Sequence, residues 1–167
     1  MEITTTYLNE AAVWSALENV KDPEIPVLSV IDMGVIYKVE VSEEPSSCTV
    51  TMTPTFVGCP AIDIMKKSVH EEVMKLGFSV VDVKVDFENT WTSDRMSEEA
   101  KLKLEKFGLA PPVVIEGELT EAQLNNVRCP HCHSTDTTLR SAFGSTLCRA
   151  IRFCFNCKQG FEQFKPV

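Results

Sequence analysis

The sequence predicts an α+β fold: a two-layer α/β sandwich in the order α-β-β-α-β, followed by a small β domain. Three observations predict it. Segments with helical and with strand periodicity alternate in the first half of the chain. Four cysteines near the other end form two Cys-x-x-Cys pairs. The charge is unevenly distributed: residues 127–167 carry six basic and two acidic side chains, a net charge of +4. Because the whole chain has a net charge of −8, residues 1–126 have a net charge of −12.

A helix is predicted over residues 9–20, where every third or fourth residue is apolar. Asn9 is its expected N-cap, because an amide oxygen can accept a hydrogen bond from a free N–H of the first turn. Pro23 and Pro26 prevent the helix from continuing, since each removes an amide donor and fixes φ.

Two strands are predicted next, over residues 35–41 and 48–53, from their alternating side chains. In the first strand Tyr37 belongs to the apolar series, whereas Ile36 belongs to the mostly polar series that faces outward. Residues 42–47 join the two strands as a hairpin loop.

A second amphipathic helix follows Gly58-Cys59-Pro60 and ends at Gly77, with apolar residues at three- and four-residue steps. Residues 81–87 alternate as a third strand. A short charged helix begins at Ser97 and is capped by Gly108.

The composition is that of an ordinary globular protein, with 44% hydrophobic and 24% charged residues. We expect a first domain over 1–116, a linker over 117–126 and a second domain over 127–167. No apolar run reaches transmembrane length, and Met1 is followed by acidic and Thr-rich sequence rather than by a signal peptide. We therefore expect a cytoplasmic protein that does not bind membranes.

The cysteine pairs predict a metal site formed by Cys129, Cys132, Cys154 and Cys157. Two residues between thiolates let one turn present both sulfurs to an ion, and two such turns complete a tetrahedron. The arrangement is similar to a zinc ribbon, although the 21 residues between the pairs slightly exceed the usual span. We expect zinc, with an iron–sulfur cluster at the same cysteines as the alternative. Cys148 is not an expected zinc ligand, but it becomes a candidate ligand if a cluster is bound.

Other uses of these cysteines are less consistent with the chain. A disulfide or redox pair suits a reducing cytosol less well than a metal site. Cys129-Pro-His-Cys132-His133 also matches the attachment motif of c-type haem, but that chemistry requires export and leaves the second pair unexplained. We expect His131 and His133 to be solvated turn residues, with either one a possible spare ligand. His133 occupies a position where glycine usually supplies a positive φ.

Cys59 is the candidate functional thiol of the first domain. It precedes a proline at a helix start, where the helix dipole favours the thiolate, which is both a nucleophile and a metal ligand. The alternative is a small buried residue. Cys48 lies in the apolar series of a strand and is expected in the core. Asp22 and Glu24 flank a proline, so they are either turn residues or hard oxygen ligands for iron beside Cys59.

Two segments resemble the signatures of the small domain in iron–sulfur assembly factors such as SufT: Asp22-Pro-Glu-Ile-Pro-Val-Leu-Ser-Val-Ile-Asp-Met-Gly34 and Thr53-Pro-Thr-Phe-Val-Gly-Cys-Pro-Ala61. Three more narrow the resemblance: Trp91 to Glu99, Phe107 to Pro112, and Phe143-Gly-Ser-Thr146 with Cys148. Together they resemble the PaaD (or PaaJ) family, a component of the bacterial phenylacetyl-CoA epoxidase system. The motifs occur in the right order and cover nearly the whole chain.

The resemblance implies an accessory role in aerobic phenylacetate degradation. Its partners would be the other epoxidase subunits, a di-iron oxygenase and a reductase that carries flavin and an iron–sulfur cluster. The chain would help to assemble their iron or iron–sulfur centres without catalysing epoxidation. By resemblance, Asp22, Glu24, Thr53 and Cys59 form the assembly motif, with iron or a cluster bound transiently at Cys59. The chain departs from the pattern at His133 and Arg95.

Two functions of other classes remain as alternatives. A thiol redox enzyme would use a Cys-x-x-Cys pair, but metal-bound thiolates cannot exchange. A nucleic-acid-binding ribbon is not expected, because four thiolates and one Zn²⁺ would reduce the +4 of residues 127–167 to about +2. The same charge suits docking on an acidic protein surface. No catalytic triad, phosphate loop or nucleotide-binding motif is present, so no catalytic residue is assigned.

Overall fold

The computed structural model describes residues 8–44, 46–115, 117–118 and 120–166, and it divides the chain into two compact units. Unit 1 ends at Thr90 and unit 2 begins at Trp91. Unit 1 has a three-stranded sheet and unit 2 a four-stranded sheet. No helix within the described ranges is long and apolar enough to cross a membrane. The chain is therefore an α+β protein in two parts, which confirms the predicted fold class.

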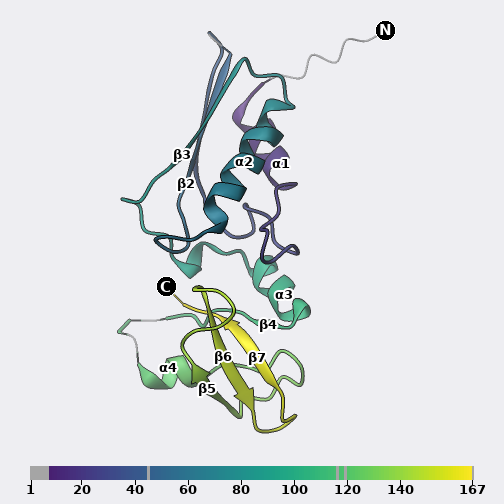
Figure 1. The fold of residues 1–167 in the computed structure, drawn as a ribbon, viewed down its shortest axis with the longest axis vertical. Helices are drawn as coiled ribbons and strands as arrows, with labels where there is room; N and C mark the ends of the chain where they lie inside the picture. Colours follow the sequence, from purple (N-terminus) through teal and green to yellow (C-terminus); the bar gives the residue numbers. More distant parts are fainter. Residues whose placement is uncertain (1–7, 45, 116, 119, 167) are drawn as a thin grey trace. The chain divides into compact units, whose positions relative to one another are not determined.

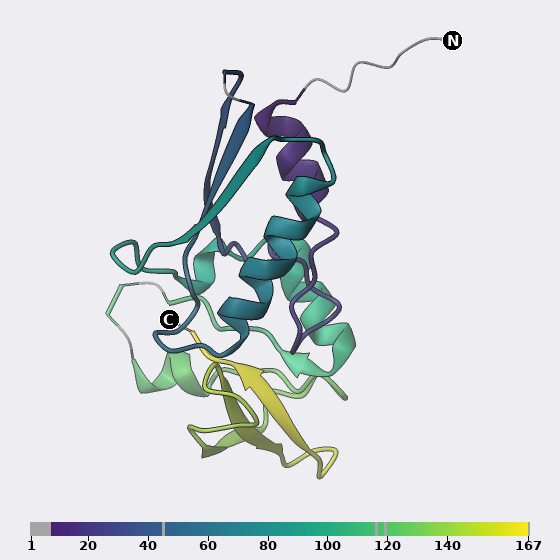
Figure 2. The same cartoon turned by 45° about the horizontal axis from the view of Figure 1, so that its top comes forward.

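Unit 1 follows the predicted order α-β-β-α-β. Its helices are α1 (Glu10–Leu17) and α2 (Ala61–Met74), and its strands are β1 (Ile36–Ser42), β2 (Ser47–Met52) and β3 (Val80–Val85). β1 pairs antiparallel with β2 and β2 pairs parallel with β3, so α2 is the crossover between parallel neighbours. Figures 1 and 2 show both helices on one face of the sheet, which gives the two layers.

The helices of unit 1 begin and bury their faces as predicted. Asn9 caps α1, because its Oδ1 accepts a hydrogen bond from the Ala12 N–H at 2.8 Å. Val13 and Leu17 are the buried residues of α1. The buried residues of α2 also recur at three- and four-residue steps: Ala61, Ile62, Met65, Val69 and Val73. These buried residues form the apolar faces of the helical layer.

The prediction of which β1 side chains are buried was wrong at Ile36 and Tyr37. The register between β1 and β2 shifts between Ile36 and Lys38, which marks a β-bulge. A bulge inserts a residue and so breaks the alternation of side chains between the two faces. As a result Ile36 is only 5% exposed, whereas Tyr37 is 45% exposed. Beyond the bulge Val39 is buried, as the sequence predicts.

The sheet of unit 2 has the strand order β4-β7-β6-β5. Its strands are β4 (Leu109–Ala110), β5 (Thr137–Ser141), β6 (Arg149–Cys154) and β7 (Gly160–Phe164). β5, β6 and β7 form an antiparallel ribbon, and β4 adds to it parallel to β7. The ribbon agrees with the predicted second β domain, whereas β4 lies outside the residues assigned to that domain.

Three short helices complete unit 2: the 3₁₀ turn η1 (Ser93–Arg95), α3 (Glu98–Phe107) and α4 (Glu121–Asn125). The ends of α3 are those predicted. The hydroxyl of Ser97 accepts a hydrogen bond from the Ala100 N–H at 3.0 Å, and Gly108 ends the helix with a φ of 90°.

Residues 91–116 lie in unit 2, whereas the sequence predicts them in the first domain. Trp91 is buried and its ring packs on Phe164, with ring centroids 5.9 Å apart. β4 pairs with β7. The segment expected as a linker also contains α4, which begins with a capping box between Thr120 and Gln123. Both features were missed because a two-residue strand and a five-residue helix are too short to show periodicity.

One carboxylate fixes the loop between β5 and β6 to β7. Glu162 Oε1 accepts a hydrogen bond from the Ser145 N–H at 2.6 Å, and its Oε2 accepts one from Arg149 Nη1 at 3.0 Å. A Cβ on Gly144 would lie 2.8 Å from Glu162 Oε1, so the loop passes too close for a side chain. The loop leaves Phe143 69% exposed at its tip.

Candidate metal centre and assembly motif

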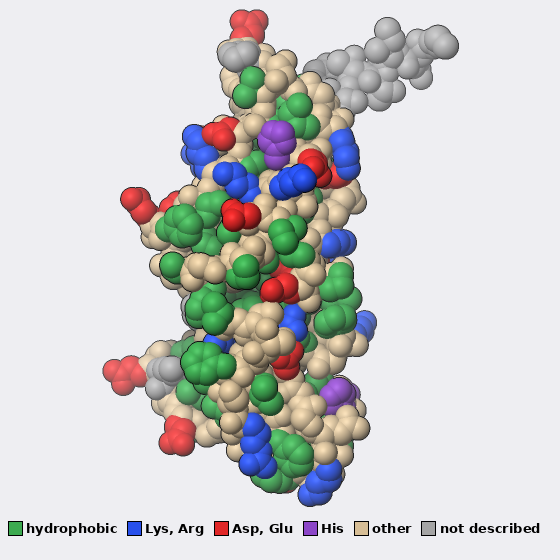
Figure 3. Space-filling view, in the orientation of Figure 1, with side chains coloured by type: hydrophobic (Ala, Val, Ile, Leu, Met, Phe, Trp, Pro, Cys, Tyr) green, Lys and Arg blue, Asp and Glu red, His purple; other side chains and the backbone are tan. Residues whose placement is uncertain are grey.

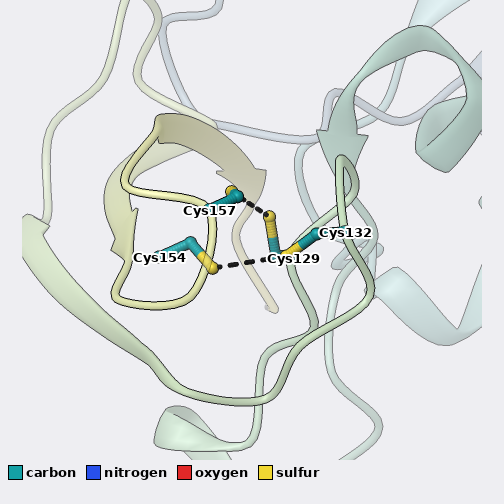
Figure 4. Close-up of side chains that lie close together, drawn as sticks. All are labelled: Cys129, Cys132, Cys154 and Cys157. Carbon is teal, nitrogen blue, oxygen red and sulfur yellow. Dashed lines mark hydrogen bonds between the residues drawn. The ribbon is translucent and has the colours of Figure 1, made fainter.

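The two Cys-x-x-Cys pairs meet at one end of the ribbon in unit 2. Cys129 and Cys132 lie in the turn before β5, and Cys154 and Cys157 lie where β6 ends and turns towards β7. Figure 4 shows the four side chains converging from these two turns. A small apolar cluster, which includes Val127 and Phe161, packs with them. The local sequence thus places four sulfurs together at the edge of a small core.

The spacing of the sulfurs fits one tetrahedral ion. All four Sγ atoms lie within 4.8 Å of one another. The Cys129 and Cys157 sulfurs are 3.7 Å apart, and those of Cys132 and Cys154 are 3.6 Å apart. A tetrahedron with metal–sulfur bonds of about 2.3 Å has edges of about 3.8 Å, whereas a disulfide requires about 2.05 Å. The cysteines are therefore free thiols arranged as a metal site, rather than as disulfides.

The backbone of both turns follows the same pattern. His133 and Lys158, the residues after the second cysteine of each pair, both have a φ of 60°. The Cys129 N–H donates to the Ser134 carbonyl at 2.9 Å, and the Cys154 N–H donates to the Gln159 carbonyl at the same distance. The positive φ predicted at His133 is confirmed. The equivalent strain at Lys158 could have been predicted from the same position in the second pair, but was missed.

The surroundings give the thiols unequal acidity. Hydrogen bonds from the Asn156 amide and the Ser134 N–H lower the pKa of Cys132 to about 6. Burial raises the pKa of Cys157 to about 12 and also raises the pKa of Cys129. A nearby dication favours the thiolate at every position, so metal binding would release protons from the most basic thiols.

The other candidate ligands near this centre lie outside it. His133 Nδ1 is 3.1 Å from Glu105 Oε1 on α3, and His131 is exposed. Neither histidine belongs to the four-cysteine group, and neither does Cys148, whose sulfur is 3.1 Å from the Thr146 hydroxyl. Cys148 therefore lies outside the four-cysteine group, and its exclusion from zinc binding stays a prediction.

Asp22 forms a turn in unit 1. Its side chain is 5% exposed, and Oδ1 accepts hydrogen bonds from the N–H groups of Glu24 and Ile25, both at 2.7 Å. This Asx turn is the structural alternative that the sequence left open. Glu24 is half-buried in the same turn. Thr53 is fully buried after β2, where its N–H donates to the Val35 carbonyl at 2.8 Å.

Cys59 lies at the start of α2 and is half-buried. Its N–H donates to the Phe56 carbonyl, and its own carbonyl accepts from the Ile62 N–H, each at 3.2 Å. Pro60 is the N-cap, so Cys59 precedes the helix by two residues. Within the part of the chain that the structure describes, Cys59, Asp22 and Glu24 do not form a group of three ligand atoms comparable to the four cysteines. A metal at Cys59 would therefore need ligands from elsewhere.

Two family models match the chain, one in each unit. Residues 10–87 match the model described as "Iron-sulfur cluster assembly protein". Residues 116–165 match the model described as "PaaD zinc beta ribbon domain". The first match contains Asp22, Thr53 and Cys59, and the second contains all four cysteines of the metal centre.

Among curated proteins, the putative D component of the 1,2-phenylacetyl-CoA epoxidase of Escherichia coli (strain K12) is 38% identical over 93% of this chain and 92% of its own. The "Fe-S protein maturation auxiliary factor" of Porphyromonas gingivalis is 45% identical over 53% of this chain and 83% of its own. The factor SufT of Staphylococcus aureus is 36% identical over 50% and 93%, respectively. The shorter relatives thus lack a counterpart to a large part of this chain.

Two solved structures share the fold of more than half of this chain. A DUF59 domain from Bacillus anthracis has a TM-score of 0.53 and 29% identity, and it covers 57% of this chain and 90% of its own. The conserved protein TM0487 from Thermotoga maritima has a TM-score of 0.51 and 32% identity, with 60% and 95% covered. The near full-length relative and the two family models, by contrast, show that the chain belongs to the PaaD family, to which the D component of 1,2-phenylacetyl-CoA epoxidase also belongs.

Proposed function

We propose that this chain is an accessory factor that helps to assemble the iron or iron–sulfur centres of a phenylacetyl-CoA epoxidase. An iron–sulfur assembly or maturation role is supported by the relatives that cover unit 1. The link to the epoxidase rests on the relative that covers both units. Its clients would be the oxygenase and reductase subunits, in the cytoplasm.

Unit 1 would bind iron or a cluster transiently through Cys59. The observation that supports this role is the contrast between its two cysteines. Cys48 is 1% exposed, and burial raises its pKa to about 11, so it is a poor ligand and nucleophile. Cys59 is only half-buried, and it lies at the positive end of α2. A site that takes its remaining ligands from the client would suit a factor that must release its metal.

The surface near Cys59 could contact a client. Val57 is 81% exposed and Ile64 is 57% exposed, on the loop before α2 and on its first turn. Figure 3 shows apolar side chains reaching the surface between charged ones on this face of the molecule. We propose that Asp22 and Glu24 act by shaping the turn that belongs to the same motif, and that Thr53 holds the end of β2.

The four cysteines of unit 2 would bind zinc with a structural role. Their sulfurs have the spacing of a single-ion site. In an iron–sulfur cluster the four cysteines are divided among at least two irons, so at least some of their sulfurs lie farther apart than around a single ion. Metal analysis and the visible spectrum of anaerobically purified protein test this proposal. We expect one zinc ion per chain and a colourless protein. Visible absorption from iron–thiolate or cluster charge transfer would instead show that the site binds iron.

The test of the whole function is a Cys59→Ser variant expressed with the epoxidase subunits. Iron content and epoxidation activity of the complex should fall, while the free energy of unfolding of the variant should stay within about 0.5 kcal/mol of the parent. Cys48→Ala is the matched control. It should lower stability by about 1 kcal/mol by removing a buried atom, yet keep full maturation activity. Undiminished iron loading with Cys59→Ser would refute the role of this thiol.

A further inference from the structure

Unit 2 contains a cavity of about 530 Å³ between α4 and the ribbon. It is separate from the four-cysteine group and from Cys59. Part of its lining is apolar, from Leu124 on α4, Leu139 on β5 and smaller side chains. The polar part comes from six side chains: Glu121, Asn125, Thr138, Arg152, Gln163 and Lys165. Its volume lies within the range of about 300–1,000 Å³ that is typical of small-molecule sites.

The strand register places the polar groups on one face of the ribbon. Arg152 of β6 pairs with Leu139 of β5, and Ala150 pairs with Gln163 of β7. Side chains two residues apart on a strand share a face, and so do those of directly paired residues. Arg152 and Gln163 therefore converge on the face that α4 covers.

These two side chains are buried but incompletely paired. Arg152 is 2% exposed and Gln163 is 3% exposed. Arg152 Nε donates to Gln163 Oε1 at 2.7 Å, and Nη2 donates to the Leu124 carbonyl. Arg152 Nη1 and Gln163 Nε2 have no hydrogen-bond partner within the described residues. None of the ion pairs formed by the described carboxylates involves Arg152.

A buried cation and two buried N–H donors without acceptors are costly, because each has lost its contact with water. An anion with two oxygens would supply what is missing. The planar guanidinium matches a carboxylate better than any other common acceptor group apart from phosphate. The apolar part of the lining, however, offers burial for a hydrocarbon body, which a free phosphate does not have.

From this arrangement we infer that the cavity binds a carboxylate carried on a small apolar body. The carboxylate lies against Arg152 and Gln163, with the Lys165 ammonium nearby, and the apolar body packs on Leu124 and Leu139. Glu121 also lines the cavity from α4, so the lining carries two cations and one anion. The inference does not depend on the proposed role of Cys59.

The ligand could be a free small molecule or the C-terminal carboxylate of a peptide chain. The test uses the full chain with its metal bound, followed by NMR and calorimetry. One pair of probes is phenylacetate and its neutral amide, phenylacetamide. The other is a pentapeptide ending in leucine with a free or an amidated terminus. We expect a carboxylate to bind about tenfold more tightly than its amide and to shift signals of Arg152, Gln163 and Leu139.

Binding of phenylacetate alone would identify a small-molecule ligand, and binding of the peptide alone would identify a chain terminus. Either result supports the site. No binding by either carboxylate, or equal binding of carboxylate and amide, overturns it.

Variants provide the second arm of the test. Arg152→Gln should abolish the preference for the carboxylate over the amide. Arg140→Gln is the matched control on β5, because Arg140 stacks on Phe153 and Phe155 at 5.2 and 5.9 Å. Since Arg152 also holds α4, Leu139→Trp fills the cavity at a 45% exposed position without removing a polar group. Unchanged affinity in Leu139→Trp would overturn the inference even if Arg152→Gln fails to fold.

Discussion

The two units of this chain are stabilised in different ways. Among the described residues, twenty apolar side chains are buried in unit 1 and twelve in unit 2, and two of those twelve are metal-centre cysteines. The buried polar groups differ as well: unit 1 buries Asp22 with three uncharged side chains, whereas unit 2 buries Arg149 and Arg152.

A sheet covered by two helices can bury enough apolar surface to be stable without assistance. A four-stranded ribbon with a small core cannot, so a metal and fixed polar contacts replace part of that surface. The difference predicts that the units respond to different perturbations.

Removal of the metal should produce the largest difference in stability between the two units. Chelation, or Cys154→Ser, should unfold unit 2 and leave unit 1 folded, because zinc binding in such sites contributes on the order of 10 kcal/mol. Amide hydrogen exchange measures both units at once. Since β4 pairs with β7, protection should be lost from Leu109 as well as from the ribbon. Cys148→Ser is the control and should retain one metal per chain. A chelated protein with unchanged protection in β6 would remove the contrast between the units.

The converse change is Leu17→Ala in α1, a fully buried position. We expect a loss of about 3 kcal/mol in the free energy of unfolding of unit 1, from lost burial and the cavity that remains. Metal stoichiometry and the exchange protection of β6 should not change. A simultaneous loss of protection in β6 would show that the two units unfold as one, contrary to their separate cores.

Glu162→Gln tests the polar contacts that support unit 2. Burial acts to raise the pKa of Glu162, but hydrogen bonds from Ser145 and the pairing with Arg149 outweigh it, so the pKa is lowered. A lowered carboxyl pKa stabilises the fold above the unfolded value of about 4.3, and this contribution is lost as pH falls through the folded value. At pH 7 the variant should lose about 1–2 kcal/mol.

The pH dependence distinguishes this effect from metal loss. Because the thiolates are the same in both proteins, their protonation cancels in the difference in unfolding free energy between parent and variant. That difference should be constant from about pH 6 to 8 and should shrink below about pH 4. A difference that does not depend on pH would mean that the carboxylate charge contributes nothing.

The smallest expected effect comes from substitutions that compare the two turns holding the cysteine pairs. Lys158→Gly should stabilise unit 2 by about 0.5–1 kcal/mol, since glycine adopts a φ of 60° without strain. His133→Gly should gain less, because it also removes the contact with Glu105. Thermal unfolding of the metal-bound protein measures both. Equal gains would show that the His133 contact has no energetic weight.

The sequence predicted the parts of the fold that depend on local chemistry. The caps at Asn9, Ser97 and Gly108 follow from residues close together in the chain. The convergence of the two cysteine pairs follows from the local Cys-x-x-Cys spacing within each pair together with the shared chemistry of the four thiols. The bulge in β1 could not be predicted, because the segment around Tyr37 keeps a regular alternation and only pairing with β2 reveals the shift.

The burial of charged side chains was the other feature that the sequence could not predict. In β6 the sequence Arg149-Ala-Ile-Arg152 gives no sign that both arginines are inside. Arg152 is buried because α4 covers it, and α4 was hidden in a segment assigned as a linker. Arg149 can be buried because it forms an ion pair with Glu162, which lies on another strand, β7. Each case depends on a partner distant in sequence.

The pairing of β4 with β7 has a consequence for biosynthesis. Unit 1 is complete once Thr90 has left the ribosome, so it can fold while the rest is being translated. Unit 2 cannot, because its edge strand at Leu109 waits for a partner that ends at Phe164. During that interval the first two metal-centre cysteines emerge without the second pair. Until Cys157 has emerged, the first pair can therefore bind another metal or be oxidised, a risk that the metal-independent core of unit 1 does not share.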